Sequence, residues 1–172
     1  MATSESTDFE LDVSDYIEEA FERCGLEVRT GYDLKTAKRS MNLLFADWAN
    51  RGLNRWTIEQ STLSITASTA IYSLPADTID ILSAVIRTGT GTSQSDTQIT
   101  RISRDTFINI PSKNTEAQPS QWYVDRQITP QIRLWPTPDK AYTLVYDRLT
   151  RIQDADSATD TLDVPFRFYP CL

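Results

Sequence analysis

The sequence contains no histidine. Histidine is the commonest general acid–base residue of enzymes and the commonest protein ligand of zinc. Serine–histidine and cysteine–histidine catalysis are therefore excluded within these 172 residues. The phosphate-binding and nucleophile motifs GxxxxGKS/T, GxGxxG and GxSxG are absent as well. We predict that the protein is not an enzyme and that it has no catalytic, cofactor-binding or metal-ligating residues and no cofactor.

Cysteine is scarce: Cys24 and Cys171 lie far apart and form no CxxC pair. Two such residues make no disulfide framework, and we expect both thiols to be buried in a reducing compartment. Long apolar runs are missing too, since none approaches the roughly 18 residues of a membrane helix. The polar, acidic residues 1–11 lack the basic and apolar regions of a secretion signal. We interpret them as a flexible lead-in and expect no membrane partner.

The sequence also lacks a basic stripe that could neutralise nucleic-acid phosphates. The net charge is −7 and the sequence pI is about 4.6. The densest basic group, Lys35, Lys38 and Arg39, has the helical spacing of one solvated helix face. An acidic protein can surround DNA, but it repels the phosphate backbone and does not hold it.

Two segments near the N-terminus carry apolar residues with the 3.6-residue period of amphipathic helices. These segments are Val13–Cys24 and Tyr32–Asn50, and Gly25 and Gly52 follow them where left-handed C-terminal caps are expected. The residues expected to cap their starts are Asp12 or Ser14 for the first helix and Thr30 with Asp33 for the second. The short linker predicts an antiparallel helical hairpin over residues 12–54.

After the second helix the apolar residues alternate with polar ones, which is typical of strands. Short strands separated by turn residues predict an antiparallel β-sandwich or barrel-like domain over residues 55–163. A short helix near residues 103–109, capped by Ser103, interrupts it. The predicted strands lie at residues 56–65, 70–74, 79–87, 98–102, 121–125, 131–135 and 142–149, and residues 88–95 form a polar loop. The fold class is therefore α+β.

The last residues, 164–172, are unusually aromatic for a chain terminus. They resemble the first turn of a helix that has been interrupted. We interpret them as the start of a C-terminal helical segment, which either continues in the native protein or is buried by a partner.

Two groups of residues allow other functions. Trp122, Tyr123 and Trp135 could form a platform on which sugars stack, although packing in the core of the β domain explains the same aromatics. The carboxylates of Asp77 and Asp80 could serve an acid-type hydrolase, if they converged on a cleft. A carbohydrate- or receptor-binding β-sandwich module is thus the alternative function.

Several stretches in a fixed order carry a resemblance that runs from about Val13 to the end of the chain. They are residues 32–54, which end in ADWANRGLN, and residues 56–60, 72–85, 123–127, 134–139 and 163–167. Together they resemble the head-to-tail adaptor proteins of short-tailed bacteriophages, of the tail tubular protein A or gatekeeper type. Each stretch is a packing and turn pattern, and none is a catalytic signature.

The resemblance implies a structural virion protein that forms a homo-oligomeric ring, usually a dodecamer. Such a ring lies between the portal protein and the tail nozzle protein, in the head-tail connector of the virion. Double-stranded DNA would pass through its lumen without specific binding, which the acidic balance of the sequence allows. The protein would be made in the host cytoplasm.

Two sets of residues are candidates for contacts with these partners. The aromatic and apolar residues of the C-terminus would face the portal or a neighbouring subunit; they are Phe166, Phe168, Tyr169 and Leu172. The loop at residues 88–95 would contact the nozzle or a neighbouring subunit through Thr88, Gly89, Gly91 and Ser93. The loop at residues 111–119 is a further candidate for the same contacts.

Overall fold

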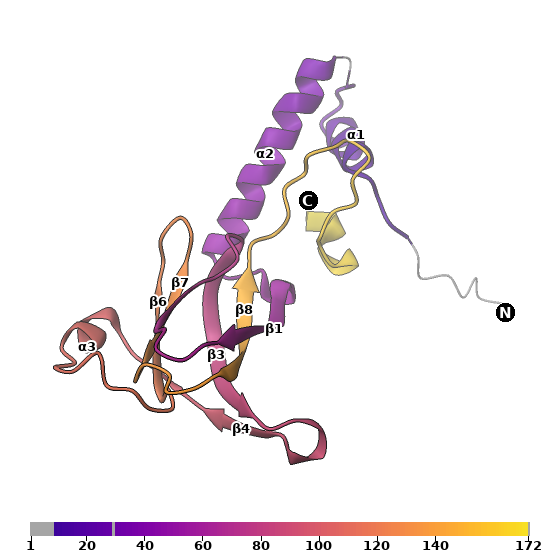
Figure 1. Cartoon of the computed structure of the whole chain (residues 1–172). Coiled ribbons are helices and arrows are strands. Elements are labelled where there is room, and N and C mark those ends of the chain that lie inside the picture. The colour runs from indigo at the N-terminus through magenta and orange to yellow at the C-terminus, as the bar shows by residue number, and fades with distance from the viewer. Residues whose placement is uncertain (1–8, 29, 172) are drawn as a thin grey trace. The chain divides into compact units, whose positions relative to one another are not determined.

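The computed structural model describes residues 9–28 and 30–171. The chain divides into two compact units (Figure 1). Unit 1 takes in residues 1–56 and 152–172, and unit 2 takes in residues 57–151. Unit 1 contains helices and unit 2 contains all the named strands, so the α+β fold class is confirmed.

Unit 1 is built on two helices, α1 (Val13–Arg23) and α2 (Gly31–Asn50), as the apolar periodicity predicts. The expected capping box is present at α2: Thr30 Oγ1 accepts from the backbone N–H of Asp33, and Asp33 accepts from the backbone N–H of Thr30. Gly25 follows α1 with a φ of 71° and Gly52 follows α2 with a φ of 69°. After both helices the backbone forms Schellman motifs, in which Leu26 N–H donates to Phe21 and Leu53 N–H donates to Trp48.

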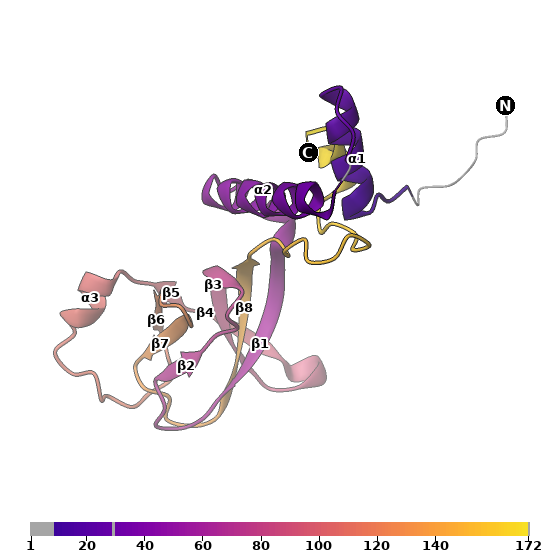
Figure 2. The same ribbon diagram turned by 90° about the horizontal axis from the view of Figure 1, so that it is seen from above.

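The C-terminal segment of unit 1 ends in a 3-10 helix, η3 (Phe166–Cys171), which lies beside α1 (Figure 2). Pro170 inside η3 has no N–H to donate, which disfavours a regular α-helix at this point. The expectation of a buried thiol is wrong for Cys24, which is exposed. The reason is its position, since Cys24 is the C-cap of α1, beyond the last turn that packs on the core.

Unit 2 consists of two four-stranded sheets, with strand orders β1-β8-β3-β4 and β2-β7-β6-β5. Every strand pair is antiparallel among the described residues except β5 with β6, which is parallel. The strands are β1 (Ile58–Ile65), β2 (Ile71–Ser73), β3 (Thr78–Thr88), β4 (Ser95–Gln98), β5 (Thr100–Arg101), β6 (Gln121–Asp125), β7 (Gln131–Trp135) and β8 (Tyr142–Thr150). The short helix α3 (Arg104–Ile108) follows β5, and the side chain of Ser103 caps it as predicted.

Both sheets contribute to one hydrophobic core. Residues that alternate along β3, β6, β7 and β8 face it, and several are almost fully buried, including Ile81, Ile86, Trp122, Ile132, Leu134 and Leu144. Apolar side chains of two sheets that meet in one core are the arrangement of a β-sandwich. Burial of these side chains is therefore the main stabilising contribution within unit 2.

The single strand predicted at residues 98–102 is instead two strands in different sheets. β4 pairs with β3, and β5 pairs with β6. Ile99 lies between them, is 3% exposed, and donates its N–H to the carbonyl of Ala84 at 3.3 Å. The alternation of side chains along an extended chain is unchanged when the chain moves from one sheet to another. The sequence pattern therefore does not reveal this crossing.

Candidate functional site

Aromatic side chains of the C-terminal segment pack within unit 1. The ring centroid of Phe168 lies 4.9 Å from that of Trp56 and 5.8 Å from that of Trp48. Tyr169 meets Tyr16 edge-to-face at 5.4 Å. Both residues, predicted as partner contacts, are therefore partly buried within their own unit.

The other two predicted contacts of the C-terminal segment, Phe166 and Leu172, differ from Phe168 and Tyr169. Phe166 is 77% exposed, so its ring is open to contact by another molecule. Leu172 lies outside the described residues. Of the three predicted C-terminal contacts that the structure describes, Phe166 is the one with a largely exposed aromatic ring.

The segment that leads to η3 is held against both helices. Val13 N–H donates to Asp160 O at 3.0 Å, and Lys38 Nζ donates to Asp156 O at 2.7 Å. The amide oxygen of Asn42 accepts from Ala155 N–H at 2.8 Å. Residues 152–163, which the sequence pattern placed in the β domain, thus belong to unit 1.

An apolar groove of about 450 Å³ lies between α1 and α2. Its lining includes Ile17, Phe21, Ala37, Met41 and Leu44, with Tyr32 at one end. Tyr32 is 75% exposed and Leu43, further along α2, is 66% exposed. An apolar groove with exposed apolar side chains on the same helix suits contact with another protein or a ligand. The sequence signal for it was the apolar stripe of α2, which is wider than the core of unit 1 covers.

The residues Thr88, Gly89, Gly91 and Ser93 lie together in the turn of the β3–β4 hairpin. The Arg87–Asp96 ion pair closes the hairpin at 2.8 Å, and the hydrogen bond from Arg87 holds the pKa of Asp96 below its usual range. Ser93 Oγ donates to Thr90 O at 2.9 Å, and η2 (Gly91–Ser93) forms the tip. A Cβ on Gly89, whose φ is 76°, would clash with the carbonyl oxygen of Ser93, so the turn requires glycine there. The predicted loop is therefore a defined hairpin turn with an exposed tip.

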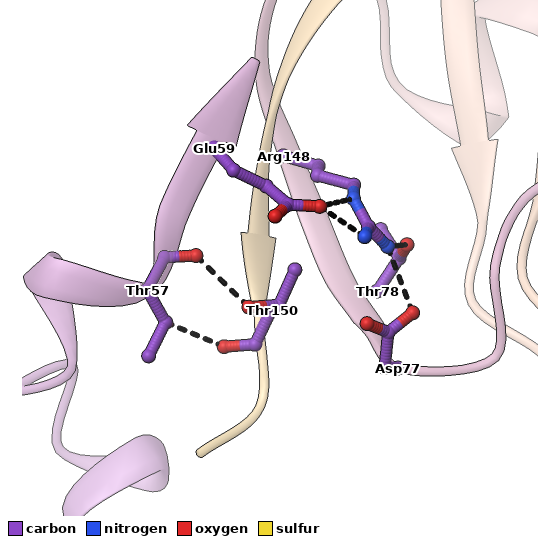
Figure 3. Close-up of polar contacts among 6 residues, drawn as sticks. All are labelled: Thr57, Glu59, Asp77, Thr78, Arg148 and Thr150. Carbon is purple, nitrogen blue, oxygen red and sulfur yellow. Dashed lines mark hydrogen bonds and ion pairs between the residues drawn. The ribbon is translucent and has the colours of Figure 1, made fainter. Parts of the chain in front are cut away.

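Arg148 joins three neighbouring strands of unit 2, as Figure 3 shows. It stands on β8 between β1 and β3, forms an ion pair with Glu59, and donates to Asp77 Oδ1 at 2.8 Å and to Thr78 Oγ1 at 3.0 Å. Its side chain is 12% exposed. Thr57 and Thr150 continue the link between β1 and β8, because each hydroxyl donates to the other residue's carbonyl, at 2.6 and 3.0 Å. This cluster is structural, and sequence reasoning missed it because its members are far apart in the chain.

Replacement of Arg148 by Met should lower the free energy of unfolding by about 2 kcal/mol. The variant keeps much of the side-chain packing but leaves two carboxylates without their cation, and these can partly recover by hydration because each is about half exposed. Urea unfolding followed by circular dichroism measures the loss. Arg87→Met is the matched control, since its ion pair closes an exposed hairpin and should matter less. Equal stability of Arg148→Met and wild type would contradict this account of the cluster.

The residues that suggested other functions are engaged elsewhere. Trp122 is 1% exposed and its Nε1 donates to Ile99 O, so it is a core residue and offers no face to a sugar. Trp135 donates to Ser112 O. Asp77 binds Arg148, whereas Asp80 binds Arg101 and Arg126. Trp122 is thus not available to a sugar platform, and Asp77 and Asp80 bind different arginines.

Within residues 9–28 and 30–171, no cluster of three or more potential metal-ligating side chains occurs. No helix in this part of the chain is both long enough and apolar enough to cross a bilayer.

Comparison with known proteins assigns this chain to a family, although it carries no catalytic motif. A search of curated proteins found no match. The sequence model of the SU10 adaptor protein family matches residues 11–172, which covers both units. The tail tubular protein A or gatekeeper type of the resemblance is a finer assignment than this match makes. The chain therefore belongs to the SU10 adaptor protein family of phage adaptors, structural virion components that are not known as enzymes.

Proposed function

We propose that this chain is the repeating subunit of a ring that joins the portal protein of a phage head to the tail nozzle protein. The observation that carries the proposal is the family match, which spans residues 11–172 and thus both units. The ring is a dodecamer, as the resemblance to head-to-tail adaptors implies. The chain has a structural role in the connector, and its partners are further copies of itself, the portal and the nozzle.

The surface of unit 1 supports a role in assembly. The groove between α1 and α2 is mostly apolar, and Tyr32, Leu43 and Phe166 are largely exposed. Burial of such side chains at an interface removes apolar area from water, which favours association. In the proposed assembly these residues contact the portal or a neighbouring subunit.

The charge of the protein supports the passage of DNA. The net charge is −7, and a wall of negative charge repels a duplex and so lets it slide. A subunit that gripped phosphates would slow ejection. The proposed lumen therefore accommodates double-stranded DNA without binding a particular sequence.

The β3–β4 hairpin is proposed as a second contact, toward the nozzle or the neighbouring subunit. Replacement of residues 89–94 by a Gly-Ser linker should leave the melting temperature nearly unchanged, because none of these residues is buried. Assembly with the portal and nozzle proteins should weaken, since the defined turn is lost. Sedimentation of the mixed proteins measures this, and Lys140→Ser, an exposed change outside the hairpin, is the control. Unchanged assembly would show that the hairpin is only a connector.

Sedimentation of the chain with purified portal protein from the same phage tests the proposed function. The expected result is a complex whose mass corresponds to one portal ring and a complete ring of this chain. The tail nozzle protein should join that complex but should not join the portal alone. A chain that sediments as a monomer, with no portal association across the accessible concentrations, would overturn the proposal.

A further inference from the structure

A basic hollow of about 590 Å³ lies on unit 2, beside α3 and the end of β6. Its lining includes Arg101, Arg104, Tyr123 and Arg126. Arg101 and Arg126 both bind the carboxylate of Asp80, at 2.9 and 2.7 Å. One acidic group thus holds two of the arginines in place, and the cluster keeps an excess of positive charge.

The local geometry leaves much of this charge accessible. Arg126 is 62% exposed and Arg101 is 41% exposed at the side chain, whereas Asp80 is 15% exposed. The other carboxylate of the lining, Asp125, is bound to Arg133 at 3.1 Å. Arg101 also donates to Ile81 O and lies over the ring of Trp122, which fixes its position. The hollow therefore presents guanidinium groups that are partly pre-organised to receive an anion.

The two units differ sharply in charge. Unit 2 carries nine acidic and nine basic side chains and is neutral overall. Unit 1 carries fifteen acidic and eight basic side chains and hence the whole net charge of −7. Four carboxylates and Arg23 give α1 a net charge of −3, and Arg23 pairs with Glu19 at 2.7 Å. Asp15, Glu18, Glu19 and Glu22 are exposed at the spacing of one helix face.

We propose that the basic hollow of unit 2 binds the acidic face of α1 in a second copy of this chain. The charges are complementary, and every copy carries one of each surface. Because the two surfaces are different patches, the contact is head-to-tail, and its repetition closes a ring or extends a filament. The inference rests on the proposed function and names the residues that make the contact between neighbouring subunits.

Carboxylates of a neighbouring copy suit this hollow better than the phosphates of DNA. Tight binding of a duplex requires several phosphate contacts, whereas the hollow has three arginines and two of them already bind Asp80. Four carboxylates on one helix face carry a lower charge density than a duplex and can be matched by three arginines.

Charge reversal tests the contact with the full chain. The hollow variant carries Arg104→Glu and Arg126→Glu, and the helix variant carries Glu18→Arg and Glu22→Arg. All four residues are exposed, so circular dichroism should match wild type, and the melting temperature should fall only slightly where Arg126→Glu removes one of the two arginines on Asp80. Mass photometry at low salt should show that each variant self-associates at least about tenfold more weakly than wild type.

Mixtures make the test specific. In a one-to-one mixture of the two variants, the native acidic α1 of the hollow variant meets the native hollow of the helix variant, and the basic α1 of the helix variant meets the acidic hollow of the hollow variant. Both contacts are complementary, so the mixture should recover larger, alternating assemblies. A chain that carries all four substitutions has exchanged charges and should recover the larger assemblies. Salt near 0.5 M should weaken the contact in wild type and in this chain alike, because it screens exposed charges.

Each other outcome overturns the inference in a recognisable way. If the hollow variant forms rings on the portal as wild type does, the contact is absent although the ring function stands. If wild type stays monomeric with and without portal, both the inference and the proposed function fail. If the hollow variant assembles normally but loses affinity for a labelled DNA duplex, the hollow holds phosphates.

Discussion

Replacement of Trp122 by Ala should lower the free energy of unfolding of unit 2 by about 4 kcal/mol. Trp122 is 1% exposed in the core that the two sheets share, and its indole N–H donates to Ile99 O at 3.2 Å. Truncation removes a large buried ring and leaves a cavity between the sheets. It also leaves the Ile99 carbonyl, at the crossing between the sheets, without its donor. Urea unfolding followed by circular dichroism measures the loss.

Two further measurements decide whether Trp122 is a core residue. Trp122→Phe should cost less than the Ala variant, because most of the apolar volume is kept. Titration of the wild type with oligosaccharides should leave tryptophan fluorescence unchanged. A stable Trp122→Ala variant, or a saturable response to sugar that the variant abolishes, would contradict the burial of this side chain and revive the carbohydrate-binding alternative.

Replacement of Phe168 by Ala should lower the free energy of unfolding of unit 1 by about 3 kcal/mol. The ring of Phe168 packs between Trp48 and Trp56, with centroids at 5.8 and 4.9 Å. It joins the core that Phe45, Ile152 and Val164 complete. Loss of the ring should loosen η3 and expose both indoles to water, which shifts tryptophan emission to longer wavelength.

The same 3-10 helix offers a matched control. Phe166→Ala removes an equal ring that is 77% exposed, and should change the stability little. It should instead weaken assembly, because Phe166 is a proposed partner contact. If both variants were equally stable, the packing of η3 onto unit 1 would be contradicted.

The helices were predictable because their signals are local. The apolar stripe of Val13–Arg23 and the capping pair Thr30 and Asp33 lie within a few residues of one another in sequence. Gly25 and Gly52 mark the C-terminal ends of the two helices, because glycine, which has no Cβ, adopts a positive φ without steric cost. Such features need no knowledge of what the helix packs against.

Strand partners and unit membership were less predictable because they depend on distant residues. The alternation of residues 95–101 gave no sign that the chain leaves one sheet at Gln98 and joins the other at Thr100. The polar residues 152–163 read as a loop of the β domain, yet hydrogen bonds from Val13 and Lys38 hold them in unit 1. Their place is set by helices more than a hundred residues earlier.

The interaction surfaces also differ in whether local sequence signals predict them. The excess apolar surface of α2 could be inferred from its stripe, and the hairpin tip from its glycines. The basic hollow could not, because Arg101, Arg104 and Arg126 come from different elements and meet only through the parallel pairing of β5 with β6. The local positive charge of these three arginines is also not apparent from the net charge of the whole sequence, which is −7.

Electron microscopy of the chain bound to the portal protein of its phage is the most direct test of the ring adaptor. The account predicts a ring of this chain stacked on the portal and coaxial with it, with an open lumen wide enough for a DNA duplex. In that ring, α1 of one subunit should lie against the hollow beside α3 of the next. Portal rings that remain bare beside monomeric chain would contradict the central claim.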